Sequence, residues 1–213
     1  MFTIITGAQF GDEGKGKIVD LLAKDYDIVA RFQGGNNAGH TVRVGDEVYK
    51  LHLIPSGILL DSRVLIGPGV VLNPEVLAEE IAMLEKHGIK VDSRKLGVDA
   101  KTSIIMPYHI ELDGLREASR EKKIGTTKRG IGYAYIDKVA RDEIRMAELI
   151  DRERFLAKLE ELAPQKEKEI AAMGGDPKIV RDPALIERYL ELGRQFATYV
   201  TDVSREINKA LDE

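Results

Sequence analysis

Residues 7–17 read Gly-Ala-Gln-Phe-Gly-Asp-Glu-Gly-Lys-Gly-Lys, and the rest of the chain is organised around this stretch. An apolar run at 2–5 precedes it and predicts a short buried strand, and an amphipathic segment at 18–23 follows it and predicts a helix. A strand, a glycine-rich loop and a helix in this order turn backbone N–H groups and a helix N-terminus toward a phosphate. The alternative is a merely flexible turn. Four glycines and two lysines within eleven residues, directly after an apolar run, favour the phosphate loop.

The metal ligand of this loop must come from an unusual position. Residues 11–17 fit the phosphate-loop pattern G-x-x-x-x-G-K, but Ile18 stands where that pattern needs a Ser or Thr to hold Mg²⁺. Asp12 is the obvious substitute, because a carboxylate beside a polyphosphate is repelled unless a cation lies between them. The sequence therefore predicts a phosphate loop whose Mg²⁺ is held by Asp12.

Composition limits the classes of protein to which the chain can belong. The 213 residues suit one large domain, and a hydrophobic content of 43% is enough for a core. The net charge of −4 argues against a nucleic-acid partner, and no apolar run approaches the ~20 residues of a membrane span. The chain contains no cysteine and begins without a signal segment. We therefore expect a soluble cytoplasmic α/β protein with neither a nucleic-acid nor a membrane partner.

A second polar, glycine-rich loop follows the strand predicted at 28–32. Residues 33–41 read Gln-Gly-Gly-Asn-Asn-Ala-Gly-His-Thr. Loops at the carboxyl ends of parallel strands line the ligand crevice of an α/β sheet, so we expect this loop and the first to face one site. A lone histidine is most often structural, but His40 lies between Gly39 and Thr41 in a polar loop, which favours a phosphate or acid–base role.

The chain between the second and third loops alternates short apolar runs with turns. A hairpin is predicted at 41–44 and 47–53, around the Gly45-Asp46 turn. Asn73-Pro74 predicts the start of a helix that ends at Gly88. Its buried stripe is Leu77, Ile81 and Leu84. Further strands are predicted at 64–66, 96–98 and 103–106, a helix is predicted from Pro107 to about 123, and His52, His87 and His109 are interpreted as structural or surface residues.

A third glycine-rich loop, 124–132, reads Ile-Gly-Thr-Thr-Lys-Arg-Gly-Ile-Gly. Its hydroxyl and N–H groups can donate to a phosphate monoester, while Lys128 or Arg129 neutralises its charge. The alternative is a solvated linker between helices. Two phosphate-type loops earlier in the chain favour a binding role for this one.

From residue 137 onward the chain is charged and helical. One helix is predicted to end at Ala163-Pro164, and a long final helix is predicted to start at Asp182-Pro183. The stripe of the final helix is Ile186, Leu190, Gly193, Ala197, Val200, Val203, Ile207 and Leu211. We therefore expect one α/β nucleotide-binding domain over 1–213. The sheet and phosphate loops lie in 1–106, and 107–213 is largely helical.

Five motifs together resemble the adenylosuccinate synthetase family. They are residues 11–17, 37–41, 52–57 (His-Leu-Ile-Pro-Ser-Gly), 124–132 and 137–141 (Asp-Lys-Val-Ala-Arg), and their order and spacing agree across nearly the whole chain. Phe10, Lys128 and Tyr133 depart from the family pattern without removing a chemical group. The resemblance implies a mostly parallel sheet flanked by helices, related to P-loop GTPases.

The resemblance also implies an activity. The family is a GTP-dependent ligase that joins IMP and L-aspartate into adenylosuccinate for AMP biosynthesis, through a 6-phosphoryl-IMP intermediate, with Mg²⁺ as cofactor. Asp12, His40 and Lys15 would be the catalytic residues, and Asp12 and the Gly39 carbonyl would hold the metal. The implied GTP and phosphate contacts are Gly11, Asp12, Glu13, Gly14, Lys15, Gly16, Lys17, Gly39, His40 and Thr41. The implied IMP contacts are Asp12, Lys15, Asn37, Ala38, Gly39, His40, Thr127 and Arg141.

Arg141 matches a residue that reaches the IMP phosphate of the neighbouring subunit, which implies a homodimer. The family continues beyond residue 213 into guanine- and aspartate-binding segments, so we expect this chain to be an N-terminal part that is inactive alone. Two alternatives are a non-catalytic fragment or assembly module and a GTPase-like nucleotide-binding module. The third loop argues against the GTPase, which needs no separate phosphate-monoester site.

Overall fold

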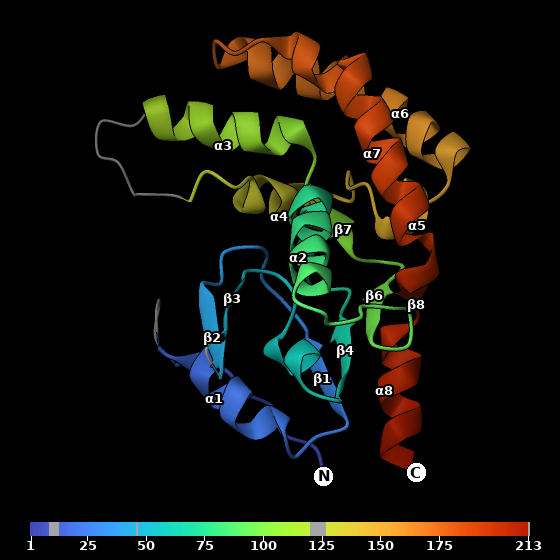
Figure 1. Ribbon diagram of the computed structural model, residues 1–213. Helices are drawn as coiled ribbons and strands as arrows, with labels where there is room; N and C mark the ends of the chain where they lie inside the picture. Colours follow the sequence, from blue (N-terminus) through green and yellow to red (C-terminus); the bar gives the residue numbers. More distant parts are fainter. Residues whose placement is uncertain (9–12, 46, 120–126, 213) are drawn as a thin grey trace.

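The computed structural model describes residues 1–8, 13–45, 47–119 and 127–212 (Figure 1). Its main sheet has four parallel strands in the order β1-β4-β6-β8. The strands are β1 (Ile28–Arg31), β4 (Arg63–Ile66), β6 (Leu96–Asp99) and β8 (Val200–Thr201). The central strands are apolar because helices and loops cover both of their faces, and Val64, Leu65 and Ile66 have no exposed surface.

Two smaller strand pairs and eight α-helices complete the described part. The β2 (His40–Val44) and β3 (Glu47–Leu51) strands form an antiparallel hairpin, and β5 (Val71–Leu72) pairs in parallel with β7 (Ser103–Ile104). The α-helices are α1 (Lys15–Ala23), α2 (Pro74–Lys86), α3 (Pro107–Ser119), α4 (Ile131–Ala140), α5 (Met146–Leu149), α6 (Arg152–Ala172), α7 (Pro183–Phe196) and α8 (Val203–Asp212). The short 3₁₀ helices are η1 (Ser56–Leu59), η2 (Pro177–Arg181) and η3 (Ala197–Tyr199).

The helices are not distributed evenly around the sheet. Figure 1 shows α3, α6 and α7 gathered at one end of the molecule, with α1 and the β2–β3 hairpin toward the other. These observations confirm the predicted fold class, a mostly parallel α/β sheet flanked by helices with a helical C-terminal portion. The single-domain boundary at 1–213 stays a prediction. Over the described ranges, no helix combines the length and apolarity needed to cross a membrane.

Helix α2 begins and ends where its local sequence predicts. The Asn73 side chain accepts hydrogen bonds from the N–H groups of Glu75 (2.9 Å) and Val76 (3.3 Å), which otherwise have no partner in the first turn. Gly88 follows the helix in a left-handed conformation (φ 78°) that favours glycine. The predicted stripe of Leu77, Ile81 and Leu84 is buried.

The predicted strand at 2–5 is wrong. Residues 1–7 form no strand, and the side chains of Phe2 and Ile4 are 61% and 64% exposed. A strand forms only when a neighbouring strand pairs with its backbone, and in the described part β1 is an edge strand with β4 as its partner. The apolar pattern was present, but no described segment offers residues 2–5 a ladder.

The helix predicted to end at Ala163-Pro164 continues to Ala172. Proline removes one N–H donor from a helix and usually kinks or breaks it. Pro164 is exposed here, however, while Ala163, Lys166 and Ile170 on the opposite face are buried. Packing of the buried face on both sides of Pro164 therefore keeps α6 continuous.

The prediction of one long final helix is also wrong, because helix α7, strand β8 and helix α8 take its place. Val200 and Thr201 pair with Val98 and Asp99 of β6 as strand β8. The Asp99 carboxylate then accepts a hydrogen bond from the Val203 N–H (3.0 Å), at the start of α8. Pairing with the sheet overrides the helical periodicity of this segment.

Candidate functional site

The first loop leads into α1 through a left-handed glycine. Gly14 has φ 76°, and its carbonyl accepts a hydrogen bond from the Lys17 N–H (3.0 Å) in the first turn of α1. The Lys15 ammonium forms an ion pair with the Glu13 carboxylate, and both groups lie so close to Gly7 that a Cβ atom there would overlap them. An exposed ion pair contributes at most about 1 kcal/mol, so Lys15 can exchange this partner for a phosphate oxygen. Gly11 and Asp12 lie outside the described residues.

Arg31, at the end of β1, anchors the second loop. This guanidinium donates hydrogen bonds to the carbonyl oxygens of Gly35, His52 (2.8 Å) and Leu53 (3.1 Å). Burial lowers the pKa of Arg31, and the nearby Glu80 carboxylate opposes that shift. Arginine stays charged in proteins, so Arg31 holds the second loop and residues 52–53 as a permanent cation.

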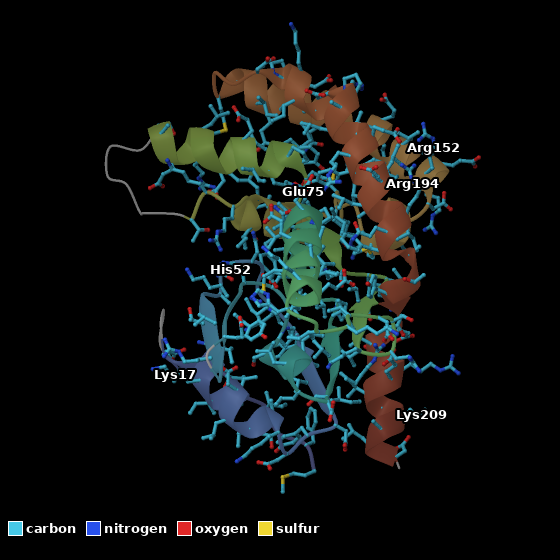
Figure 2. The ribbon with its side chains drawn as sticks, in the orientation of Figure 1. Lys17, His52, Glu75, Arg152, Arg194 and Lys209 are labelled. Atoms are coloured by element: carbon cyan, nitrogen blue, oxygen red, sulfur yellow. The ribbon has the colours of Figure 1, made fainter. Side chains whose placement is uncertain are left out.

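The Glu80 carboxylate, on α2, binds the backbone N–H groups of residues 52–54. Its carboxylate accepts hydrogen bonds from the N–H groups of His52 (2.6 Å), Leu53 (2.9 Å) and Ile54 (2.8 Å). Burial raises the pKa of Glu80, while these three hydrogen bonds act in the opposite direction. Figure 2 shows His52 beside α2, where the hairpin ends. Residues 52–54 are therefore held by Glu80 through their amides and by Arg31 through two of their carbonyls.

His52 connects this clamped segment to the second loop. Its Nδ1 lies 2.6 Å from the Ala38 carbonyl oxygen. A carbonyl oxygen only accepts, so Nδ1 carries the proton. His52 is structural, as the sequence indicated. It supports the backbone of Ala38, the residue before Gly39.

The third loop contacts the second loop directly. The Arg129 guanidinium donates to the Asn36 carbonyl, and a Cβ atom at Gly35 would lie only 3.0 Å from Ile131 Cγ1. The Tyr135 hydroxyl accepts from the Gly34 N–H (2.7 Å) and donates to the Gly69 carbonyl (2.8 Å). These contacts place the two loops side by side.

The helix that follows the first loop contacts the strand that follows the second loop. The second loop runs directly into β2, and α1 contacts β2 (Figure 1). Figure 2 shows Lys17 on this helix, on the side of the molecule where the hairpin lies. The backbone of His40 begins β2, and its side chain lies outside the described part.

Sequence reasoning missed two residues of this region. Asn36 is 3% exposed, and within the described part its Oδ1 has no hydrogen-bond partner, which is rare for a buried polar atom. Asn36 therefore gives the second loop an unused acceptor. A single sequence offered no means of separating it from Asn37. Tyr135 had no signal either, because an aromatic residue within a helix usually belongs to the core.

The other predicted binding residues are accessible. Asn37, Gly39, Thr41 and Thr127 are exposed, and Ala38 is partly buried. No ligand contact tests their roles, so these stay predictions.

Both ends of α4 carry backbone that L-residues rarely adopt. Lys128 (φ 51°) precedes the helix and Arg141 (φ 68°) follows it, and they are the non-glycine residues with positive φ in the described ranges. Such conformations are uncommon and gather at functional sites. Helix α4 lies between Thr127 and Arg141 in the chain, and its ten residues span about 15 Å.

The fold and these loops define a class of protein. A parallel α/β sheet with a glycine-rich loop after its edge strand, and further glycine-rich loops beside it, is the arrangement of nucleotide-binding proteins. Within the ranges that the structure covers, no cluster of three or more His, Asp or Glu side chains could hold a metal.

Comparison with known proteins identifies the family. A family model described as adenylosuccinate synthetase matches residues 4–213. The chain is 91% identical to the adenylosuccinate synthetase of Methanosarcina barkeri, over 100% of this chain and 50% of that protein. It is 49% identical to that of Clostridium kluyveri, over 98% of this chain and 49% of that protein. The chain belongs to the adenylosuccinate synthetase family.

A solved structure agrees with this assignment. The fully ligated adenylosuccinate synthetase from Plasmodium falciparum superposes with a TM-score of 0.83 at 33% identity, over 97% of this chain and 47% of that one. The chain spans about half the length of the curated relatives it matches.

Proposed function

We propose that this chain supplies the IMP- and phosphate-handling part of a GTP-dependent ligase that joins IMP and L-aspartate into adenylosuccinate. The contact between Arg129 and the Asn36 carbonyl carries the proposal, because it brings a loop suited to a phosphate monoester beside the second loop, whose strand β2 contacts helix α1 of the first phosphate loop. A reaction between two phosphorylated substrates needs such adjoining sites. Membership of the family supports the same activity and a role in purine biosynthesis.

The catalytic residues have distinct proposed tasks in the phosphoryl transfer. Asp12 takes the proton from N1 of IMP, so that O6 attacks the γ-phosphorus of GTP and GDP leaves. Lys15 and His40 stabilise the charge on the transferring phosphoryl group, which is mainly an electrostatic task. The amino group of aspartate then attacks C6, and the phosphate on O6 leaves. Phosphorylation is required because an unmodified O6 is a poor leaving group.

The residues present fit a magnesium ion. Mg²⁺ prefers oxygen ligands, and the Gly39 carbonyl and the Asp12 carboxylate are both oxygen donors. Gly39 is exposed, and a Cβ atom added there would meet nothing within 4 Å, so there is open space beside it. When bound there, Mg²⁺ would neutralise charge on the β- and γ-phosphates of GTP.

The proposed enzyme is a homodimer in which Arg141 enters the neighbouring subunit's IMP site. The length of α4 supports this, because it separates Arg141 from Thr127 of the same chain. On the same helix the side chains of Ile136 and Val139 are 50% and 83% exposed, and they are three residues apart. A second subunit would bury these apolar side chains next to Arg141.

The test compares the 213-residue chain with the native gene product. Each is incubated with IMP, GTP, aspartate and Mg²⁺, and the chain is also mixed with the separately expressed remainder of any longer product. We expect IMP binding by the chain alone, and adenylosuccinate only from the longer product or the mixture. Robust product from the chain alone would contradict the division of the site. GTP hydrolysis without any response to IMP would favour a GTPase-like module instead.

A further inference from the structure

A buried hydrogen-bonded network of three charged or titratable side chains lies between α3, α4 and α6. His109, Asp137 and Lys166 are 1%, 2% and 3% exposed. His109 Nε2 lies 2.9 Å from one oxygen of the Asp137 carboxylate, and the Lys166 ammonium contacts the other. The proposed reaction uses none of these three groups.

The surroundings of His109 determine where its proton lies. The Met106 N–H donates to Nδ1 (2.9 Å), so Nδ1 must accept, and the Nε2–H group donates to the Asp137 carboxylate. A second proton on Nδ1 would face the Met106 N–H. The imidazole is therefore neutral, and the ionic partners are Asp137 and Lys166.

Such a network is not the best way to stabilise a core. The desolvation penalty of a buried ion pair can exceed its Coulombic gain, and apolar residues of similar size often stabilise as well or better. The network does fix a geometry, because hydrogen bonds to both carboxylate oxygens hold Asp137 in one orientation relative to α3 and α6. Asp137 belongs to α4, so the network fixes the position of that helix.

Helix α4 is held at both ends. At its start, the Gly130 N–H donates to the Asp113 carboxylate of α3 (3.1 Å), and a Cβ atom at Gly130 would lie 2.8 Å from the His109 backbone. At its end, the Asp137 side chain joins the network, and the Asp137 carbonyl accepts from the Asp142 N–H (2.9 Å). Thr127 lies three residues before Gly130, and Arg141 directly precedes Asp142.

We propose that His109, Asp137 and Lys166 are positioning residues that hold α4 so that its two ends present Thr127 and Arg141 to the 5′-phosphates of IMP. Thr127 serves the site of its own chain and Arg141 that of the neighbour. The inference rests on the proposed function, since it assigns the network to the IMP subsite of that reaction. The three residues act on the binding of the IMP 5′-phosphate and not on the binding of GTP.

The variants separate positioning from packing. Lys166→Met removes the cation and leaves the Asp137 carboxylate without its ionic partner. The double variant Asp137→Asn with Lys166→Gln keeps a hydrogen-bonded chain without charge, because the new amide can accept from His109 Nε2–H and donate to the glutamine. Lys158→Met is the matched control, since it removes an exposed ion pair with Glu161 from the same helix.

The experiment titrates the native gene product with IMP, inosine and GTP by calorimetry, with thermal melts to verify folding. Lys166→Met should weaken IMP binding roughly ten- to a hundredfold, the scale of effect of a displacement of about 1 Å, with inosine and GTP binding changed less than about twofold. The double variant and Lys158→Met should bind IMP like wild type. Inosine lacks the 5′-phosphate, so a merely structural role would weaken IMP and inosine together.

Each result decides the matter. Equal losses for IMP and inosine, or unchanged IMP binding in a folded Lys166→Met variant, would overturn the proposal. If Lys166→Met does not fold, Asp137→Asn replaces it, because the new amide NH2 faces the Lys166 ammonium and breaks that hydrogen bond. Weakened IMP binding with inosine binding retained supports the proposal, and equal losses or no loss refute it. Wild-type protein that fails to bind IMP at all would instead refute the proposed function.

Discussion

Arg129 donates a hydrogen bond to the backbone carbonyl of Asn36, and this contact joins two glycine-rich loops 93 residues apart in the sequence. The Tyr135 hydroxyl reinforces the junction at Gly34. Both side chains come from the segment that forms α4 and its leading loop. The second loop is therefore hydrogen-bonded both to α4 and to the loop that precedes it.

Asp12→Asn should abolish most ligase activity in the native gene product while leaving the fold intact. The amide cannot take the N1 proton of IMP, and loss of a general base typically reduces the rate by ~10²–10⁴-fold. A steady-state assay of adenylosuccinate formation measures this. Asp25→Asn, on an exposed residue after α1, is the control and should be neutral. Activity within a few-fold of wild type would contradict the role of Asp12.

His40→Ala should lower kcat strongly and change IMP binding little. Its proposed task arises only as charge develops on the transferring phosphoryl group, and removal of one such donor costs about 10²–10³-fold in kcat. Steady-state kinetics and calorimetry with IMP separate the two effects. His87→Ala, at the end of α2, should leave both unchanged. Loss of IMP binding with normal turnover would show that His40 binds substrate instead.

Glu80→Gln should destabilise the protein by roughly 1–3 kcal/mol, the usual cost of leaving buried polar groups unsatisfied. The carboxylate accepts three backbone N–H groups, and the amide nitrogen of glutamine would oppose at least one of them. Urea denaturation measures the free energy of unfolding. Glu79→Gln, on the exposed neighbouring position of α2, should change it by less than about 0.5 kcal/mol. Equal effects of the two substitutions would refute the clamp on residues 52–54.

Stability should fall as the pH falls below about 6.5, the ordinary pKa of histidine. Burial lowers the pKa of His109 in the folded state, although the hydrogen bond to Asp137 opposes the shift. Between the pKa of His109 in the folded chain and its pKa in the unfolded chain, the unfolded chain binds a proton that the folded chain does not. The free energy of unfolding therefore rises with pH in this window. Denaturation between pH 5 and 7.5 should show this slope.

His109→Gln should flatten that slope, because glutamine does not titrate but can still donate to Asp137. His87→Gln is the matched control, since His87 lies at the surface end of α2. The two variants should therefore differ in pH dependence. A slope unchanged by His109→Gln would show that another group is responsible.

Mixing Asp12→Asn with Arg141→Leu protein should restore activity that neither variant has. In a mixed dimer one site receives both intact residues, so random exchange of subunits should recover about a quarter of wild-type activity. The assay follows adenylosuccinate after the subunits exchange. Two Arg141 variants mixed with each other are the control. No recovery, in a mixture shown to form mixed dimers, would place Arg141 in the site of its own chain.

The sequence by itself determined the family and those local elements that depend on neighbouring residues. The cap at Asn73, the β2–β3 hairpin around Gly45 and the stripe of α2 depend on residues within a few positions of each other, and all three are confirmed. The five glycine-rich and charged motifs were enough to identify the family that the comparisons then showed. Their order along the chain also predicted neighbouring phosphate loops.

Tertiary structure alone decided which segments found partners. Residues 2–5 have strand periodicity but no ladder, whereas Val200 and Thr201 lie in a helical pattern and pair with β6. The contacts of His52 with Ala38, Arg129 with Asn36 and His109 with Asp137 join residues 14 to 93 positions apart. Periodicity reports which face of an element is apolar, but a hydrogen bond needs two particular groups at a set distance, and only the folded chain brings them together.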